Sequence, residues 1–251
     1  MTPSAAVSEV NPAGRSRILL LCDHATNIVP EDVAGGDLGL PPQEMARHIA
    51  WDIGAAGVTE ALSGLLDAAA VLTRFSRLVI DPNRGEDDPT LVMRLYDGTL
   101  VPANRAVGPA EIERRLEAFH RPYHRAVAAA IARLAAAGRA PALVAIHSFT
   151  PRLKGRAPRP WQVGILWHRD GRIALPLIAR LRAEGFCVGD NEPYSGELEG
   201  DTMSRHGTRN GLPHVLIELR HDLIATPDDQ RLWAERLAPM LAQVIEEVPD
   251  G

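Results

Sequence analysis

The sequence predicts a single α/β domain of three layers, in which a mostly parallel or mixed sheet lies between helices. Short apolar runs typical of buried strands alternate along the chain with longer segments of helical periodicity. No internal repeat and no shift in composition divides the chain into two domains. With 251 residues, 45% of them hydrophobic and 24% charged, the chain is long and apolar enough to bury a sizeable core.

The N-terminal segment looks unlike the rest. Residues 1–16 are rich in small and polar residues, include Pro3, Pro12 and Gly14, and lack the apolar stretch of a signal peptide. We therefore expect a disordered leader over residues 1–16 and one catalytic domain over residues 17–251. No apolar run approaches the roughly 20 residues that span a bilayer, and two cysteines do not make a disulfide framework. The expected location is the cytoplasm, with no membrane contact.

The first half of the domain begins with a predicted strand, because an apolar run with polar residues on both sides is typical of a buried strand. The Gly- and Pro-rich residues 30–42 predict a loop, and the acidic, turn-rich residues 85–107 suit an active-site loop. The elements expected here are strands over residues 17–22, 70–73 and 78–80, and a helix over residues 43–66.

The second half begins with a long predicted helix. Pro109 stands near its start, acidic residues follow in the first turn, and the alanine-rich run ends at Gly138. The elements expected beyond it are strands over residues 142–146, 161–167, 186–188 and 214–219, helices over 173–184 and 228–247, and loops over 151–160 and 190–211.

The charge distribution limits the class of partner. Lysine and arginine number 27 against 32 acidic residues, a formal net charge of −5, and the arginines are scattered. A protein that follows a nucleic-acid backbone needs a basic face. We expect a small-molecule substrate and no nucleic acid; the sequence does not determine the oligomeric state.

Two histidines follow predicted strands. His24 comes after the apolar residues 19–22, and His147 comes after residues 143–146. Ligands of parallel sheets bind at the carboxyl ends of the strands, and imidazole is a common zinc ligand. The pair therefore predicts a shared metal, which Asp23 would support by orienting a ring. The alternative is that each histidine only hydrogen-bonds backbone at its strand end.

Glu218 stands inside the last apolar run. A carboxylate is costly to bury unless it is paired, and Arg220 projects to the same face of a strand, so a buried ion pair is one interpretation. The other is a glutamate of raised pKa that handles protons beside a metal-bound water.

Candidate substrate-binding residues lie in two loops. Asp81, Asn83 and Arg84 follow the predicted strand at 78–80, and the planar guanidinium of Arg84 suits a carboxylate, although a turn with a solvated arginine is an equal alternative. The long loop at 190–211 supplies further candidates for a pocket wall, namely Asn191, Glu192, Tyr194 and His206.

A second pair of histidines lies on the long helix. His120 and His124 have the i, i+4 spacing of metal ligands. Pro122 separates them, and the glutamate of an HExxH motif is missing. Structural roles are therefore favoured for both.

Taken together, these motifs resemble the N-formylglutamate amidohydrolase family. They occur in the family's order from about residue 17 to the end, so the resemblance covers nearly the whole chain. The segments that carry it are residues 23–30 (DHATNIVP), 76–84 (SRLVIDPNR), 122–124 (PYH), 147–149 (HSF), 191–196 (NEPYSG) and 217–224 (IELRHDLI).

The resemblance implies both a fold and a set of roles. The family is similar to zinc carboxypeptidases, with a phosphorylase/hydrolase-like fold. By this likeness His24 and His147 would bind Zn²⁺, and Glu218 would activate water and then protonate the leaving amine. Arg84, helped by Arg220, would hold the carboxylate of the substrate.

The third metal ligand is the point where the sequence departs from the pattern. Asn27 stands three residues after His24, where a carboxypeptidase has glutamate. Either Asn27 ligates through its amide oxygen, or Asp52 or Asp23 completes the site, or metal affinity is reduced.

The expected activity is metal-dependent hydrolysis of a linear amide, most simply N-formyl-L-glutamate to formate and glutamate. Two alternatives stay open: a hydrolase of another N-acyl amino acid or small peptide, and a non-catalytic binding protein with a degenerate metal site.

Overall fold

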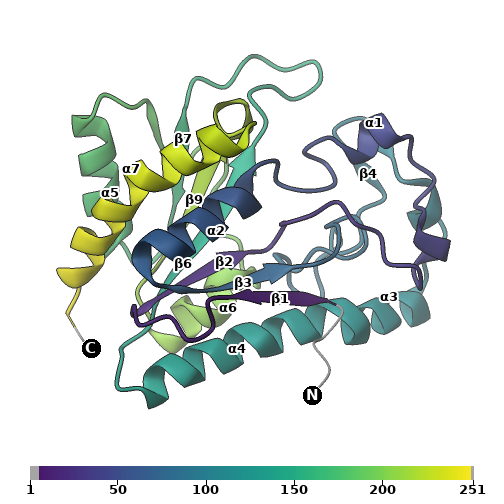
Figure 1. Cartoon of the computed structure of the whole chain (residues 1–251). Coiled ribbons are helices and arrows are strands. Elements are labelled where there is room, and N and C mark those ends of the chain that lie inside the picture. The colour runs from purple at the N-terminus through teal and green to yellow at the C-terminus, as the bar shows by residue number, and fades with distance from the viewer. Residues whose placement is uncertain (1–5, 250–251) are drawn as a thin grey trace.

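The computed structural model describes residues 6–249, which form an α/β domain built on a seven-stranded mixed sheet (Figure 1). This is the predicted fold class. The strand order across the sheet is β1-β3-β2-β6-β9-β7-β8, and a separate two-stranded sheet pairs β4 with β5. The strands are β1 (Val7–Val10), β2 (Ile18–Cys22), β3 (Ala69–Thr73), β4 (Leu95–Tyr96), β5 (Thr99–Leu100), β6 (Ala142–Phe149), β7 (Val163–Leu166), β8 (Val188–Asp190) and β9 (His214–Arg220).

Strand direction changes towards each edge of the sheet. The central strands β3, β2, β6 and β9 are parallel to one another. At one edge β1 runs antiparallel to β3, and on the other side β7 runs antiparallel to β9 while β8 is parallel to β7. The carboxyl ends of β2, β6 and β9 therefore meet at one edge of the sheet, where polar side chains gather.

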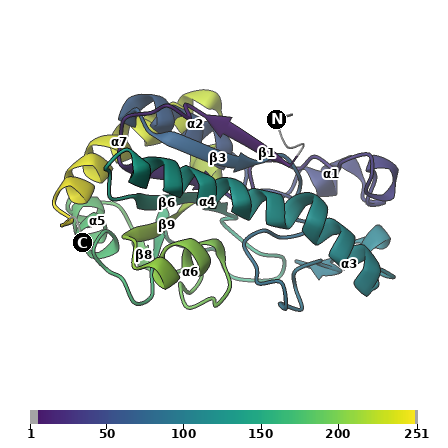
Figure 2. The same ribbon diagram turned by 90° about the horizontal axis from the view of Figure 1, so that it is seen from below.

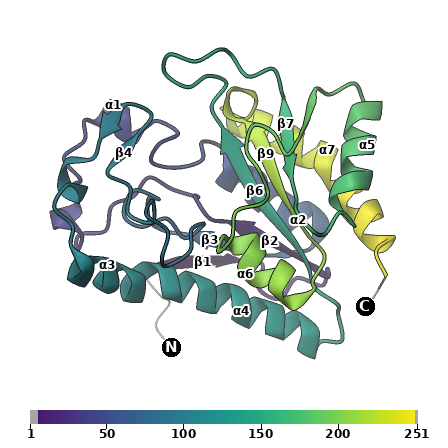
Figure 3. The ribbon, with the colours of Figure 1, turned by 180° about the vertical axis from the view of Figure 1, so that it is seen from behind.

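Helices cover both faces. The side chains of α2, α5 and α7 pack on one face, and α4 and α6 lie across the other (Figures 1 and 3). Within residues 6–249, no helix combines the length and apolar character needed to cross a membrane. The helices are α1 (Pro42–Met45), α2 (Ala55–Leu66), α3 (Pro109–Arg115), α4 (Arg121–Ala136), α5 (Ala174–Ala183), α6 (Thr202–His206) and α7 (Pro227–Glu246), with a π-helical turn η3 (Leu116–His120) and 3₁₀ turns η1 (Ala34–Gly36), η2 (Pro102–Asn104), η4 (Thr208–Asn210) and η5 (His221–Leu223).

Strand alternation divides the core into two halves. In β2, Ile18 and Leu20 face the α2/α7 layer, whereas Leu19 and Leu21 face the α4 layer. The same alternation in β6 and β9 turns Leu143, Ala145 and Leu216 towards α4. Polar residues in phase with this second set therefore point to the α4 side of the sheet.

Part of the expected leader is ordered. Val7–Val10 forms β1, with Val7 opposite Thr73 and Val10 opposite Ala70 in β3. The strand is short and only its first residue is fully buried, so its sequence shows little apolar patterning. Residues 1–5 of the expected leader lie outside the described residues.

The helix expected over residues 43–66 is broken in the middle. Only α1 and α2 are helical, and an irregular segment of turns joins them. Gly54 ends that segment at φ +81°, and a Cβ there would lie 2.2 Å from the carbonyl oxygen of Ile224. The break is functional in effect, because it holds Asp52 near the sheet edge.

The apolar residues Leu78–Ile80 form a buried turn rather than the expected strand. Two of their carbonyls are satisfied by side chains instead of a neighbouring strand. The amide of Asn104 donates to the carbonyl of Leu78, and Arg115 donates to that of Val79, each at 2.8 Å. Backbone carbonyls that are buried without hydrogen bonds to a neighbouring strand need such side-chain partners.

The long helix predicted from Pro109 contains a π-helical turn. The N–H of Arg121 bonds to the carbonyl of Leu116, five residues back, just before Pro122. Proline has no N–H to continue the α-helical ladder, which is the physical reason for an irregularity at this point. Figure 2 shows α4 running across the sheet beyond this turn.

Candidate active site

A cavity of about 130 Å³ lies at the edge where β2, β6 and β9 meet, and His24, His147 and Glu218 line it. His24 follows β2 after one residue, as expected. His147 and Glu218 lie inside β6 and β9 rather than beyond their ends. Both belong to the set of side chains that faces α4, so they open into the same space.

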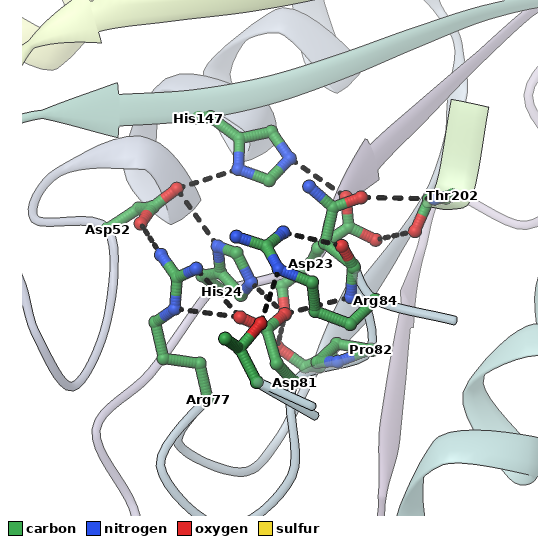
Figure 4. Close-up of polar contacts among 12 residues, drawn as sticks. Asp23, His24, Asp52, Arg77, Asp81, Pro82, Arg84, His147 and Thr202 are labelled. Atoms are coloured by element: carbon green, nitrogen blue, oxygen red, sulfur yellow. Dashed lines mark hydrogen bonds and ion pairs between the residues drawn. The ribbon is translucent and has the colours of Figure 1, made fainter. Parts of the chain in front are cut away.

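Asp52 lies between the two histidines. Its Oδ2 atom is 3.3 Å from Nδ1 of His24 and 2.8 Å from Nδ1 of His147 (Figure 4). The backbone N–H of Ser148 and the guanidinium of Arg77 also approach this carboxylate, at 3.2 and 3.5 Å. All three side chains are buried, and one ligand atom from each lies within 4.8 Å of the others.

Each imidazole is held from its other side by a second carboxylate. Nε2 of His24 lies 2.7 Å from Asp81, and Nε2 of His147 lies 2.8 Å from Asp23. The aspartates are fixed in turn, because Arg77 donates to Asp81 at 2.7 Å and Thr202 donates to Asp23 at 2.7 Å. Figure 4 shows the two carboxylates flanking the rings.

This arrangement fits a divalent metal. A metal-bound histidine typically gives its second nitrogen to a carboxylate, which fixes the ring and leaves the first nitrogen for the ion. Here Asp81 and Asp23 occupy that position and both Nδ1 atoms face Asp52. Two imidazoles and one carboxylate are a common set of protein ligands for catalytic zinc.

The charges in the cluster are strongly coupled. Burial alone would lower the pKa of His147, but hydrogen bonds with Asp23 and Asp52 outweigh it and hold that pKa well above its usual value. Burial acts in the opposite sense on Asp23, where the nearby histidines prevail and bring the pKa to about 2. The aspartates are therefore ionised at neutral pH.

Asn27 has a different place from the one expected. Its side-chain amide donates to the carbonyl of Met45 at 2.9 Å, and the residue is only partly buried. Asp52, one of the alternatives that the sequence allowed, stands with the two histidines instead. Because Asp52 is 28 residues from His24, sequence spacing gave no sign of this contact.

Glu218 is buried next to the cluster. It lies directly opposite His147 in the parallel register of β6 and β9. Its Oε2 atom has no hydrogen-bond partner within residues 6–249, and burial raises the pKa of this carboxyl to about 7. The alternative ion pair with Arg220 does not form, because Arg220 pairs with Asp222 at 2.8 Å near the surface.

Arg84 and Asn83 line the cavity, as the sequence suggested for substrate binding. The guanidinium of Arg84 donates to Thr90 at 3.2 Å and to the carbonyl of Asn83 at 2.7 Å. Among the described residues it forms no ion pair with a carboxylate. An arginine without an acidic partner at a cavity wall is suited to an anionic ligand.

Of the other candidates, Tyr194 lines the cavity, whereas Asp81, Arg220, His206, Asn191 and Glu192 do not. Asp81 lies behind His24, and Arg220 points to Asp222. His206 stacks on His124, away from the cavity. The side-chain oxygen of Asn191 accepts hydrogen bonds from the backbone of Trp167 and Gly196, both at 3.0 Å, so it shapes the loop.

Other residues of the cavity were not assigned from the sequence. Arg77 lies under the ring of Tyr96, with 5.4 Å between its guanidinium carbon and the ring centroid. Asp201, the N-cap of α6, has a pKa raised to about 6 by burial. Arg77 stands in the apolar run before Asp81. A charged residue in an apolar run is the one sequence feature that could have pointed to a residue of this group.

Two glycines let the loop that carries Tyr194 lie flat on the sheet. A Cβ on Gly164 would lie 2.2 Å from the carbonyl oxygen of Glu192, and one on Gly189 would lie 2.3 Å from the same atom. Gly164 is also the residue opposite Glu218 in β7. The small residues thus let this loop, including Tyr194, close one side of the cavity.

Comparison with known proteins shows the family of the chain. A family model described as N-formylglutamate amidohydrolase matches residues 16–225. A crystal structure of a gene product from Agrobacterium tumefaciens is 36% identical, with a TM-score of 0.91, and the match covers 96% of this chain and 95% of that one. The crystal structure of N-formylglutamate amidohydrolase from Ralstonia eutropha is 24% identical, with a TM-score of 0.63, and covers 95% of this chain and 99% of that one. No curated protein matches the sequence. This chain therefore belongs to the N-formylglutamate amidohydrolase family, and is a hydrolase that acts on linear amide bonds.

Proposed function

We propose that this protein is a metal-dependent amidohydrolase that cleaves N-formyl-L-glutamate to formate and glutamate. One observation carries the proposal: the buried group of His24, Asp52 and His147 shares a cavity with a glutamate of raised pKa, Glu218. Membership of the family supports the choice of substrate.

His24, Asp52 and His147 would hold a zinc ion, with Asp81 and Asp23 orienting the rings. A zinc ion in such a site supplies a Lewis acid for the amide carbonyl and lowers the pKa of water to about 7. The role of the protein is to fix the ligands in a buried setting, which the hydrogen bonds around each imidazole achieve.

Glu218 would carry the proton between water and the leaving group. In the metal-free protein burial raises the pKa of this carboxyl to about 7, and a carboxyl whose pKa is raised towards neutrality is a better proton acceptor than an ordinary glutamate. In the reaction, the oxygen of water forms a bond with the acyl carbon and its proton passes to Glu218. The carbon–nitrogen bond then breaks, and Glu218 gives the proton to the departing amine.

Arg84 would bind a carboxylate of the substrate. Its guanidinium faces the cavity and has no acidic partner among the described residues, and Asn83 lies beside it. Such a pair orients the substrate before the reaction, and correct orientation lowers the activation barrier in addition to any gain in affinity. Arg220 has no part in this proposal because Asp222 occupies its guanidinium.

A release assay tests the activity. Purified protein is incubated with N-formyl-, N-acetyl- and N-succinyl-glutamate, with and without added zinc, and free amine is measured. We expect turnover of the formyl substrate that a chelator removes and zinc restores. Faster release from another acyl group would keep the chemistry and change the substrate. Inertness towards all three, in protein shown to contain zinc, would contradict the assignment.

Metal analysis separates the enzyme from a non-catalytic binding protein. Protein purified without chelator is expected to contain near-stoichiometric zinc. Protein that neither contains zinc nor takes it up would favour the binding protein with a degenerate site.

A further inference from the structure

Three buried histidines that the proposed chemistry does not use form a stack on the α4 side of the site. They are His120 in η3, His124 in α4 and His206 in α6, and we call them the histidine stack. The ring centroids of His120 and His124 are 4.5 Å apart, and those of His124 and His206 are 5.2 Å apart. Because His120 and His124 are one helical turn apart, both rings reach the same neighbouring segment.

That segment is the turn from Asp81 to Arg84. Nε2 of His124 lies 3.0 Å from the carbonyl oxygen of Pro82, and Nε2 of His120 lies 2.9 Å from that of Arg84. A carbonyl oxygen only accepts hydrogen bonds, so each Nε2 must carry the proton and donate. The two histidines therefore hold the turn through hydrogen bonds to its backbone.

The hydrogen bonds also fix the protonation of the stack. A neutral imidazole has one N–H, so Nδ1 of His124 is an acceptor, and it lies 3.0 Å from Nε2 of His206. His206 is then the donor. Burial lowers the pKa of all three rings, that of His206 to about 4, so the neutral forms are the stable ones at neutral pH, and the hydrogen bonds then select their tautomers.

The turn from Asp81 to Arg84 also carries residues of the candidate active site. Asp81 bonds to His24 at 2.7 Å, and the guanidinium of Arg84 donates to the carbonyl of Asn83 at 2.7 Å (Figure 4). The side-chain oxygen of Asn83 accepts from the backbone of Thr202 at 3.0 Å. Arg84 itself has no ion pair within residues 6–249, and the shorter of its two hydrogen bonds goes to the carbonyl of Asn83 in the same turn, so its position depends on the backbone of this turn.

We propose that His120 and His124 are positioning residues, which hold the turn at Pro82–Arg84 so that Arg84 meets the carboxylate of the substrate, and that His206 sets the tautomer of His124. This inference rests on the proposed function only in that Arg84 binds a substrate carboxylate. The stack acts through Arg84 and touches neither substrate nor metal.

A double-mutant cycle tests the coupling. The dissociation constant of N-formyl-L-glutamate is measured by calorimetry in zinc-loaded Glu218→Gln protein, where turnover does not interfere. His120→Leu and His124→Leu each remove one donor and are expected to weaken binding by about 10-fold. His120→Gln and His124→Gln keep an N–H donor and should stay within about 3-fold of the parent.

The decisive comparison is made in an Arg84→Ala background. If the histidines act through Arg84, the leucine substitutions cause no further loss there. Zinc content is measured for every variant, and Arg125→Gln, on an exposed position of α4, is the matched control and should bind as the parent does. Losses that persist without Arg84, or glutamine variants as weak as the leucine ones, would overturn the proposal.

Nitrogen NMR of the imidazoles gives a readout that needs neither substrate nor a folded variant. In wild-type protein at neutral pH, His120 and His124 are expected as neutral Nε2–H tautomers. A charged ring or an Nδ1–H tautomer at either position would contradict the proposed hydrogen bonds to the turn. If the protein proved unable to bind N-formyl-L-glutamate, the proposed function would fail while the tautomers still decided this point.

Discussion

Glu218 lies directly opposite His147 across the parallel strands β9 and β6, so the two side chains leave the same face of the sheet side by side. Neighbouring strands are roughly 4.8 Å apart, and ladder hydrogen bonds fix that spacing. The residue proposed to move protons and a residue proposed to hold the metal are thus placed relative to each other by the sheet itself. Sites on such rigid elements keep their geometry better than sites on loops.

Replacing Glu218 with Gln should remove the proton carrier and leave the proposed metal ligands in place. We expect kcat to fall by about 10²- to 10⁴-fold, the usual contribution of a positioned acid–base group. Zinc content, measured by elemental analysis, should stay unchanged. Near wild-type turnover in this variant would remove Glu218 from its role.

The same substitution should stabilise the metal-free fold in alkaline solution. The carboxyl of Glu218 has a pKa of about 7 when folded against 4.5 as its ordinary value. Between these values the folded state binds more protons than the unfolded state, so the contribution of Glu218 to stability falls as the pH rises and the cost is complete above pH about 7. The cost is about 3 kcal/mol at 1.36 kcal/mol per pKa unit.

Urea unfolding in chelator measures this effect. The free energy of unfolding of Glu218→Gln should exceed that of wild type by about 3 kcal/mol at roughly pH 8.5. The two values should agree near pH 4, where Glu218 is mostly protonated in both the folded and the unfolded protein. A difference that does not change with pH would show that the carboxyl is not destabilised by burial.

Asp52 and Asn27 can be compared directly as the third metal ligand. Asp52→Asn should weaken zinc binding by more than the 10- to 100-fold that loss of an outer partner of a ligand costs. Asn27→Ala should leave the affinity within a few-fold, because its amide bonds to the carbonyl of Met45. Competition with a chromophoric chelator gives both affinities, and the reverse ranking would restore Asn27 as the ligand.

Arg84 and Arg220 offer a similar contrast for the substrate. Arg84→Gln is expected to raise KM or lower kcat/KM by about 10- to 100-fold, the worth of a hydrogen bond to a charged group. Arg220→Gln loses the pair with Asp222 and a long hydrogen bond to the carbonyl of Trp161, neither of them in the cavity, and should change kcat/KM less than 3-fold. Steady-state kinetics on N-formyl-L-glutamate decides the point, and equal effects would mean that Arg84 has no special contact.

The central strands of the fold could be predicted because their apolar runs are continuous. The expected ranges at 17–22, 70–73 and 214–219 differ from β2, β3 and β9 by one residue at an end. The sequence does not predict β1, because most of the side chains of this short strand are not buried. It wrongly predicts a strand at Leu78–Ile80, because apolar composition alone does not reveal that side chains bind the carbonyls of Leu78 and Val79.

The site could be predicted only where one residue carried its own signal. His24, His147 and Glu218 stood out because each is polar at the end of, or within, an apolar run. Asp52 did not, since it fits the polar side of a helical pattern and only the break at Gly54 brings it to the histidines. The role of His120 and His124 also depends on a contact with a turn some 36 to 42 residues away, which spacing does not encode.

The ring of aspartates around the two imidazoles has an electrostatic consequence. Asp23, Asp52 and Asp81 carry three negative charges, and Arg77 returns one positive charge. With both imidazoles neutral, these four side chains have a net charge of −2. Either two protons or one divalent cation neutralises it. Zinc uptake should therefore be a proton exchange, visible in calorimetry as a heat that varies with the ionisation enthalpy of the buffer. Acid and metal compete for the same two units of charge.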